Sequence, residues 1–219
     1  MKQVIHGLPT NVFPLEAAPG APLLVGMHGL GSNEDDLPSA FVSLEGRAAM
    51  AFPRSPLPHP PGYAWYRLIR IGVPDPASFE AGLSTLDTWI DELRQVSDFA
   101  ERPLILSGFS QGAIMSLSYA LRHPEKVAGV MAFSGYIPPF VLDSLPAPTL
   151  DLPQFKAFLT LGRQDALFPF SRLEESAQAL VARGIQPEVF AHDGGHEIPR
   201  EAMAAATAWF GRAFPAGAR

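Results

Sequence analysis

The sequence has no cysteine among its 219 residues, which excludes disulfides, thiolate catalysis and cysteine-based metal sites. Charged residues are scarce at 17% of the chain, against about 25% in an average domain, and the formal net charge is -6. Proteins that bind nucleic acids usually carry a basic surface, so we expect no nucleic-acid partner. No apolar run reaches the roughly 18 residues of a membrane-spanning helix, so no membrane span is expected.

The first residues of the sequence are not typical of a secretory signal. Residues 1–7 read MKQVIHG and contain no apolar core of a secretory signal peptide, so we expect a cytoplasmic protein. The sequence shows no linker and no internal repeat, and its length suits a single domain over residues 1–219. The carboxylates form no cluster at ligand spacing, so we expect neither a metal nor another cofactor.

Six apolar runs are typical of strands that are covered on both faces, because they are apolar at both alternating sets of positions. These runs span residues 23–27, 48–52, 104–107, 127–133, 155–161 and 188–192. Residues 1–15 are expected to form an antiparallel hairpin at one edge of the same sheet.

Helical patterns lie between these runs. Asp75 and Pro76 are suited to begin a helix, and an apolar stripe with steps of four and three residues follows them, formed by Phe79, Leu83, Leu86, Ile90 and Leu93. A second helix is predicted from Ser171, with Glu174 completing a capping box, and a third from near Pro199. This alternation predicts the α/β class, with a mainly parallel sheet and helices on both faces.

Two proline-rich stretches interrupt the alternation, at residues 53–74 and 138–153. Proline fixes φ and has no N–H to donate, so both stretches are predicted as ordered loops without sheet pairing. Loops at the carboxyl ends of parallel strands line the ligand crevice in this class of fold. We therefore expect these two stretches to flank a binding site.

A serine lies between two glycines at the point where a strand-like run passes into a helical pattern. The stretch GFSQG at residues 108–112 fits G-x-S-x-G, a pattern that chance produces in about one chain in ten of this length and composition. Its place between strand and helix makes it more specific, because a tight turn there raises a serine hydroxyl into the crevice. Side chains at Gly108 and Gly112 would collide across that turn. The context predicts Ser110 as a nucleophile.

A serine nucleophile needs a general base and an acid that orients the base. With this type of turn the partners follow in the order acid, then histidine. His196, in the stretch DGGHE after the last strand-like run, is the predicted base. Asp165 follows the preceding run and is the predicted acid, with Asp143 or Asp151 as the alternative. Asp193 is interpreted as a residue that shapes the histidine loop.

Catalysis by such a serine also needs donors for the oxyanion. The backbone N–H of Gln111, directly after the serine, is one candidate. The second should come from the loop after an early strand, where HGLGSN at residues 28–33 places the N–H of Leu30. His28 is interpreted as a histidine that braces this turn.

Taken together, the stretches HGLGSNEDDL, FPRSP, GYAWY, GFSQGA, GRQDALFP and GGHEI resemble the phospholipase/carboxylesterase family of α/β-hydrolases, which includes acyl-protein thioesterases and small bacterial carboxylesterases. The resemblance extends over about residues 20–212. It implies a catalytic triad, an oxyanion hole and a tryptophan near the acyl site, formed by Ser110, Asp165, His196, Leu30, Gln111 and Trp65. The chain departs from the family at Ala113, where a glycine is usual, and at Arg67, which we interpret as a solvated side chain.

We therefore expect a serine hydrolase that cleaves small-molecule carboxylic esters, and thioesters as a related class, through an acyl-enzyme. The interval between residues 133 and 155 is too short for a lid of several helices. An open cleft flanked by Trp65, Tyr66, Leu167 and Phe168 is predicted, which favours short to medium acyl chains. The alternatives are thioesterase or lysophospholipase activity on longer acyl groups, a different acyl transfer such as peptide cleavage, and a catalytically silent binding module. The sequence leaves a homodimer open, because exposed aromatic residues suit a dimer surface as well as a pocket.

Overall fold

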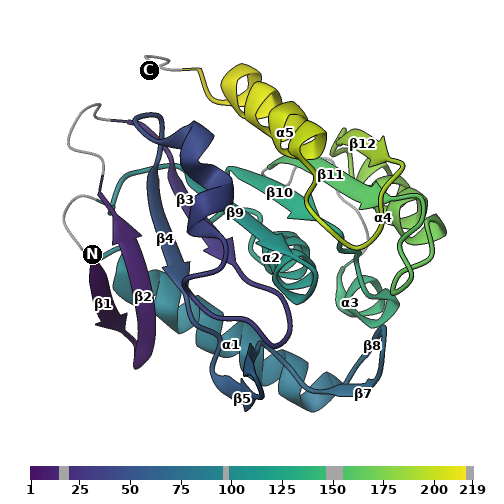
Figure 1. Cartoon of the computed structure of the whole chain (residues 1–219), viewed down its shortest axis with the longest axis horizontal. Coiled ribbons are helices and arrows are strands. Elements are labelled where there is room, and N and C mark those ends of the chain that lie inside the picture. Colours follow the sequence, from purple (N-terminus) through teal and green to yellow (C-terminus); the bar gives the residue numbers. More distant parts are fainter. Residues whose placement is uncertain (15–19, 96–98, 147–154, 216–219) are drawn as a thin grey trace.

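The computed structural model describes residues 1–14, 20–95, 99–146 and 155–215. An eight-stranded sheet runs through them in the order β1-β2-β4-β3-β9-β10-β11-β12 (Figure 1). Six of these strands are those predicted from the apolar runs: β3 (Leu23–Met27), β4 (Ala49–Pro53), β9 (Leu104–Phe109), β10 (Gly129–Phe133), β11 (Lys156–Gly162) and β12 (Glu188–His192). The six pair in parallel, which confirms the predicted fold class.

The N-terminal hairpin is also confirmed. Strands β1 (Lys2–Ile5) and β2 (Leu8–Phe13) pair antiparallel, and β2 pairs antiparallel with β4. His6 and Gly7 connect the two strands with φ values of 46° and 74°, as a two-residue hairpin turn requires. The hairpin therefore forms the edge of the sheet that lies farthest from β12.

Alternate side chains of the parallel strands enter two different cores. Leu23 and Val25 belong to one hydrophobic cluster, and Leu24 between them belongs to the other. Strand β9 repeats the pattern, with Leu106 in the first cluster and Ile105 in the second. Both faces of β3 and β9 are buried, which explains why these strands carry apolar residues at both alternating sets of positions.

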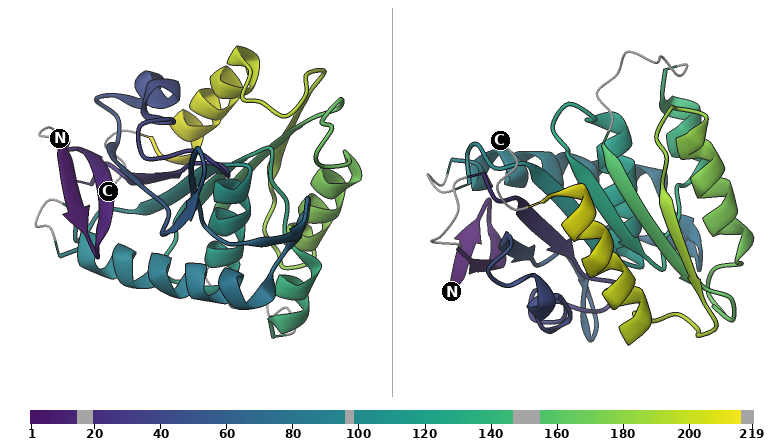
Figure 2. Two further views of the ribbon diagram at one scale, coloured as in Figure 1. Left: turned by 60° about the horizontal axis from the view of Figure 1, so that its bottom comes forward. Right: turned by 90° about the horizontal axis from the view of Figure 1, so that it is seen from above.

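Helices cover both faces, as Figure 2 shows. Helices α1 (Pro76–Leu93), α2 (Gln111–Arg122) and α4 (Ser171–Val181) supply side chains to the first cluster. Helix α5 (Arg200–Ala213) and the 3-10 helix η1 (Pro38–Leu44) supply side chains to the second. Helix α2 packs against β3, β9 and β10 at the middle of the sheet.

The ends of two helices test the predicted caps. The side chain of Asp75 accepts a hydrogen bond of 2.9 Å from the N–H of Ser78, so the predicted start of α1 is confirmed. The capping box predicted for α4 is wrong. Phe170 occupies the cap position and Ser171 is already the first helical residue, so its hydroxyl is one position too late to cap the helix.

The expectation that residues 53–74 contain no sheet pairing is wrong. Two short antiparallel ribbons form there, one from β5 (Leu57–His59) and β6 (Gly62–Ala64), the other from β7 (Leu68–Arg70) and β8 (Val73–Pro74). The prolines of these ribbons, Pro58 and Pro74, lie in β5 and β8, which pair with a strand on one side only. Proline is tolerated there because no donor is needed on the unpaired side.

The second proline-rich stretch forms a helix in part. Helix α3 (Pro139–Ser144) begins with a proline at its first position, which suits the fixed φ of that residue. Residues 147–154 of this stretch lie outside the described residues. Within the described residues no large lid covers the sheet, and none of the helices is long and apolar enough to cross a bilayer.

Candidate active site

Ser110 occupies the tight turn between β9 and α2. Its φ and ψ are 54° and -116°, a conformation that residues other than glycine rarely adopt and that costs backbone strain. A Cβ on Gly108 would overlap the backbone of Gly112, and one on Gly112 would overlap the carbonyl of Met27. The steric explanation for the two glycines is therefore confirmed.

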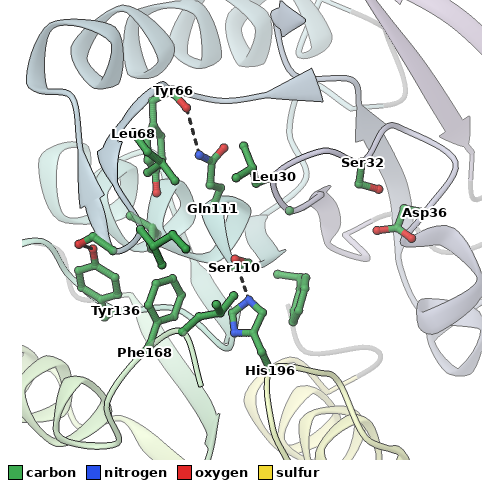
Figure 3. A pocket seen from close by; sticks show the side chains of 16 residues that line it. Leu30, Ser32, Asp36, Tyr66, Leu68, Ser110, Gln111, Tyr136, Phe168 and His196 are labelled. Atoms are coloured by element: carbon green, nitrogen blue, oxygen red, sulfur yellow. Dashed lines mark hydrogen bonds between the residues drawn. The ribbon is translucent and has the colours of Figure 1, made fainter. Parts of the chain in front are cut away.

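A chain of hydrogen bonds links Ser110 to His196 and Asp165. His196 Nε2 lies 2.9 Å from Ser110 Oγ (Figure 3), and His196 Nδ1 lies 2.7 Å from Asp165 Oδ2. An ionised carboxylate only accepts hydrogen bonds, so Nδ1 carries the ring proton and Nε2 accepts from the serine hydroxyl. In this arrangement a histidine can take the proton of a serine.

The carboxylate of Asp165 bonds to backbone groups of its own turn and to His196 at the same time. Its Oδ1 accepts hydrogen bonds from the N–H groups of Leu167 at 2.8 Å and Phe168 at 2.9 Å, which leaves Oδ2 for His196. The carboxylate side chain is fully buried. Capping a turn and orienting an imidazole are thus compatible roles of one residue.

The imidazole of His196 is packed between two aromatic rings. The centroids of Phe109 and Phe168 lie 4.9 Å and 5.2 Å from that of the imidazole. The His196 side chain is 16% exposed, and Ser110 is 8% exposed. The pair is therefore held in place and still reaches the surface.

The other candidate acids lie elsewhere. Asp143 lies in α3, and Asp151 lies outside the described residues. The side chain of Asp193 is 93% exposed and lies 3.7 Å from Arg163. The carboxylate that contacts His196 is that of Asp165.

His28 braces the turn after β3, as predicted. Its Nδ1 lies 2.7 Å from the carbonyl oxygen of Gly29, and its Nε2 accepts a 3.0 Å hydrogen bond from the N–H of Ser55. The ring is therefore neutral with its proton on Nδ1. Burial lowers the pKa of His28, because the charged form would lose its hydration there.

Two backbone N–H groups are free beside Ser110. In the described part of the chain, no acceptor takes the N–H of Leu30 or of Gln111, and both residues line the same cavity as Ser110. Gln111 is also the first residue of α2, where the unpaired amides of a helix favour negative charge. These two groups are available to an oxyanion.

The loop that carries Leu30 is anchored at several points. The N–H of Gly31 donates to the carbonyl of Tyr63, and the N–H of Tyr63 donates to the carbonyl of Ser32, at 2.8 Å and 2.9 Å. The buried carboxylate of Glu34 accepts two hydrogen bonds of 2.7 Å from Arg54. Such bidentate pairs fix orientation as well as position.

The side chain of Gln111 holds the segment between the two ribbons in place. Its Oε1 accepts from the N–H of Trp65 at 3.0 Å. Its Nε2 donates to the carbonyl of Tyr66, also at 3.0 Å (Figure 3). Trp65 was expected at the acyl site, but it is fully buried and is not among the residues that line the cavity. Its indole N–H instead donates to the carbonyl of His28 at 3.0 Å.

A cavity of about 450 Å³ opens at Ser110, a volume typical of small-molecule sites. It is lined by Gly29, Leu30, Ser32, Asp36, Tyr66, Leu68, Ile71, Gly72, Phe109, Ser110, Gln111, Ile114, Tyr136, Leu167, Phe168 and His196. Tyr66, Leu167 and Phe168 are therefore where the sequence analysis expected them. Arg67 is exposed and is not among these lining residues, in agreement with its interpretation as a solvated side chain.

The two ends of the cavity differ in polarity. In Figure 3 Tyr66, Leu68, Tyr136 and Phe168 lie on one side of Ser110, and Ser32 and Asp36 lie on the other. Most of the apolar wall was not predicted from the sequence, notably Leu68, Ile71, Ile114 and Tyr136. A signal for Tyr136 was available, because it follows the carboxyl end of β10, where crevice residues of this fold class gather.

The described residues contain no group of three or more histidines and carboxylates that could hold a metal ion. His192 precedes His196 by four residues, a spacing that unites two ligands on a helix. Here His192 ends β12, and its Nδ1 accepts from the N–H of Gly194 at 3.2 Å. The two histidines therefore do not share a site.

Comparison with known proteins places these features in a family. The sequence pattern of the family described as Phospholipase/Carboxylesterase matches residues 15–210. The putative hydrolase MhqD of Bacillus subtilis is 24% identical over 86% of this chain and 92% of its own length. Acyl-protein thioesterase 1 of Debaryomyces hansenii is 28% identical over 64% of each chain.

Solved structures agree with the fold. The carboxylesterase of Bacillus cereus superposes with a TM-score of 0.81 at 18% identity, over 94% of this chain and 95% of that one. Esterase PE8 superposes with a TM-score of 0.80 at 27% identity, over 94% of this chain and 98% of that one. The likeness thus extends over nearly the full length of both.

Proposed function

This chain belongs to the phospholipase/carboxylesterase family, and we propose that it hydrolyses carboxylic esters with Ser110 as nucleophile, His196 as base and Asp165 as acid. It is a hydrolase of the esterase and thioesterase type. The observation that carries the assignment of residues is the continuous hydrogen-bond chain from Ser110 Oγ through His196 to Asp165, at the wall of a cavity. 

The first half of the reaction forms an acyl-enzyme. His196 Nε2 takes the hydroxyl proton as Ser110 Oγ bonds to the acyl carbon, and the carbonyl oxygen becomes an oxyanion. The N–H groups of Leu30 and Gln111 stabilise this charge, and Asp165 stabilises the imidazolium. The carbon–oxygen bond of the ester then breaks, and the leaving alcohol receives the proton from His196.

The second half of the reaction releases the acid. A water molecule gives its proton to His196 and attacks the acyl carbon, which forms a second oxyanion in the same place. This intermediate collapses when the bond to Ser110 breaks and the serine regains its proton. Thioesters follow the same steps with a thiol as leaving group.

The polarity of the cavity indicates how an ester binds. The apolar end beside Tyr66, Leu68 and Phe168 takes the acyl chain, and the end beside Ser32 and Asp36 takes the leaving group. The volume of about 450 Å³ and the absence of a large lid over the described residues favour short to medium acyl chains.

Hydrolysis of p-nitrophenyl esters from C2 to C12 tests this proposal, with wild type beside Ser110→Ala. Wild type should turn over these esters with a maximum between C2 and C6. Ser110→Ala should lose at least about a thousand-fold in kcat, because the attacking atom is removed. Ser118→Ala is the matched control, since Ser118 is buried on the same helix and does not line the cavity.

Equal rates in wild type and Ser110→Ala would refute the nucleophile. A maximum at C10 or C12 would refute the chain length and favour the longer acyl groups of thioesterase or lysophospholipase substrates. Labelling of Ser110 by a fluorophosphonate without turnover of any ester would refute ester hydrolysis and favour a different acyl transfer by an activated serine. The absence of both labelling and turnover would favour the silent binding module.

A further inference from the structure

Tyr66 has a hydroxyl group that the fold does not use. The residue is 1% exposed, yet its hydroxyl makes no hydrogen bond to any described residue. Among the described residues, the fully enclosed side-chain polar atoms without a partner belong to Ser55, Ser118, Thr160 and His192. The hydroxyl of Tyr66 is not one of them, so it has open space beside it. That space is the cavity of Ser110, which Tyr66 lines.

The other polar groups near this end of the cavity are already paired. Tyr136 Oη donates to the carbonyl oxygen of Gly72 at 2.7 Å. The amide of Gln111 bonds to the backbone of Trp65 and Tyr66. Leu68 and Phe168, which lie at this end in Figure 3, are apolar, and Ile71, Ile114 and Leu167 add further apolar side chains to the lining of the cavity. Of the described side chains placed at this end, the phenol of Tyr66 is thus the donor that has no partner.

The phenol is also held in position. The backbone of Tyr66 is fixed by Gln111, and its ring packs on Phe79 with the centroids 4.9 Å apart. Figure 3 shows the side chain extending from that fixed backbone toward the part of the cavity where Tyr136 lies. Burial raises the pKa of Tyr66 well above its usual value, so the hydroxyl keeps its proton and can donate.

A phenylalanine would fill this place without a polar atom. An unpaired polar group in an apolar wall costs free energy, so such groups usually have a partner. No partner exists in the described part of the chain, and the hydroxyl opens on the end of the cavity that takes the acyl chain under the proposed function. The partner that the geometry leaves room for is an atom of the substrate.

We propose that Tyr66 Oη donates a hydrogen bond to a neutral oxygen on the acyl chain, so that the preferred substrates are esters of ether-, keto- or hydroxy-substituted acids. This inference rests on the proposed function. A carboxylate on the chain is disfavoured, because no lysine or arginine is among the described residues that line the cavity, and an unpaired anion is costly in apolar surroundings.

Matched pairs of p-nitrophenyl esters test the inference. Each pair consists of a straight-chain ester from C4 to C8 and its analogue with one methylene replaced by an ether oxygen, at each position in turn. For each pair, kcat/KM of the ether ester is divided by kcat/KM of the straight-chain ester. This ratio is measured for wild type and for Tyr66→Phe. Comparing the two enzymes cancels the intrinsic reactivity of each ester, which the oxygen also changes.

At one position of the oxygen, the ratio should be about 3- to 10-fold higher in wild type than in Tyr66→Phe, the worth of one neutral hydrogen bond. Tyr136→Phe is the control for a lost phenol, because the hydroxyl of Tyr136 is already bound to Gly72. Its two kcat/KM values should change in the same proportion, so its ratios should match those of wild type.

Equal ratios in wild type and Tyr66→Phe at every position would overturn the inference while leaving the proposed function intact, because the plain esters are still hydrolysed. The inference would also be overturned if Tyr136→Phe lowered the kcat/KM ratio as much as Tyr66→Phe does. If Tyr66→Phe does not fold, the wild-type ratios are compared with those for hydroxide-catalysed hydrolysis, and equality at every position overturns the inference. No turnover of any ester by wild type would overturn both proposals.

Discussion

Replacing Gln111 by methionine removes the clamp beside the nucleophile while keeping the length of the side chain. Gln111 is buried and makes two hydrogen bonds of 3.0 Å, to the N–H of Trp65 and the carbonyl of Tyr66. Methionine can make neither bond, and the two backbone groups stay in the protein without a partner. The variant therefore isolates the cost of unpairing two buried backbone groups.

The size of the effect follows from that count. A buried group left without its partner costs about 1–3 kcal/mol, and the more apolar side chain of methionine offsets part of the sum. We expect Gln111→Met to lower the free energy of unfolding by about 2–4 kcal/mol. For a chain of this size, that corresponds to a melting temperature about 5–15 °C lower.

Urea unfolding of wild type and variant, followed by circular dichroism, measures the difference. Ser118→Ala is the control on the same helix, because the Ser118 hydroxyl is equally buried and has no partner among the described residues. Its removal should change the free energy of unfolding by less than about 0.5 kcal/mol. A loss below about 0.5 kcal/mol in Gln111→Met, or an equal loss in both variants, would refute the reasoning.

Two further predictions concern the turns beside Ser110. Because the pKa of His28 is lowered in the folded protein, the unfolded chain binds a proton first as the pH falls. The stability that this residue contributes above its ordinary pKa of 6.5 is therefore lost below it. Wild type should lose more unfolding free energy than His28→Gln between about pH 7.5 and pH 5.5, and equal losses would contradict this. Gly112→Ala should unfold at room temperature or fail to fold, because its Cβ would overlap the carbonyl of Met27. Gly195→Ala is the control and should keep the wild-type melting temperature, because the nearest neighbour of its Cβ would lie at 3.8 Å. A Gly112→Ala variant with the wild-type melting temperature would refute the steric argument.

Those elements that depend on local patterns could be predicted from the sequence. The apolar runs identified the parallel strands because these strands are buried on both faces, and the stripe from Phe79 to Leu93 identified α1 because one face of that helix is buried. The capping box at Ser171 was wrong because the spacing of Ser171 and Glu174 does not specify which residue is the N-cap and which is the first helical residue. The ribbons within residues 53–74 were not predicted because their prolines were taken to exclude all pairing. A proline prevents hydrogen bonding only on the side of the strand to which its nitrogen points, so the other side can still pair.

Sequence alone determined the class of the fold and the turn at Ser110, and it predicted Asp165 and His196, which the structure links to Ser110 by hydrogen bonds. Each depends on a chemical requirement that a short stretch must meet: glycine where a side chain would collide, and an acid and a histidine at the ends of successive strands. Only the tertiary structure decided the shape of the cavity, the place of Trp65 behind its wall and the free hydroxyl of Tyr66. The physical reason is that a cavity surface joins side chains from distant segments, and which of their polar atoms remain unpaired depends on how all of those segments pack together.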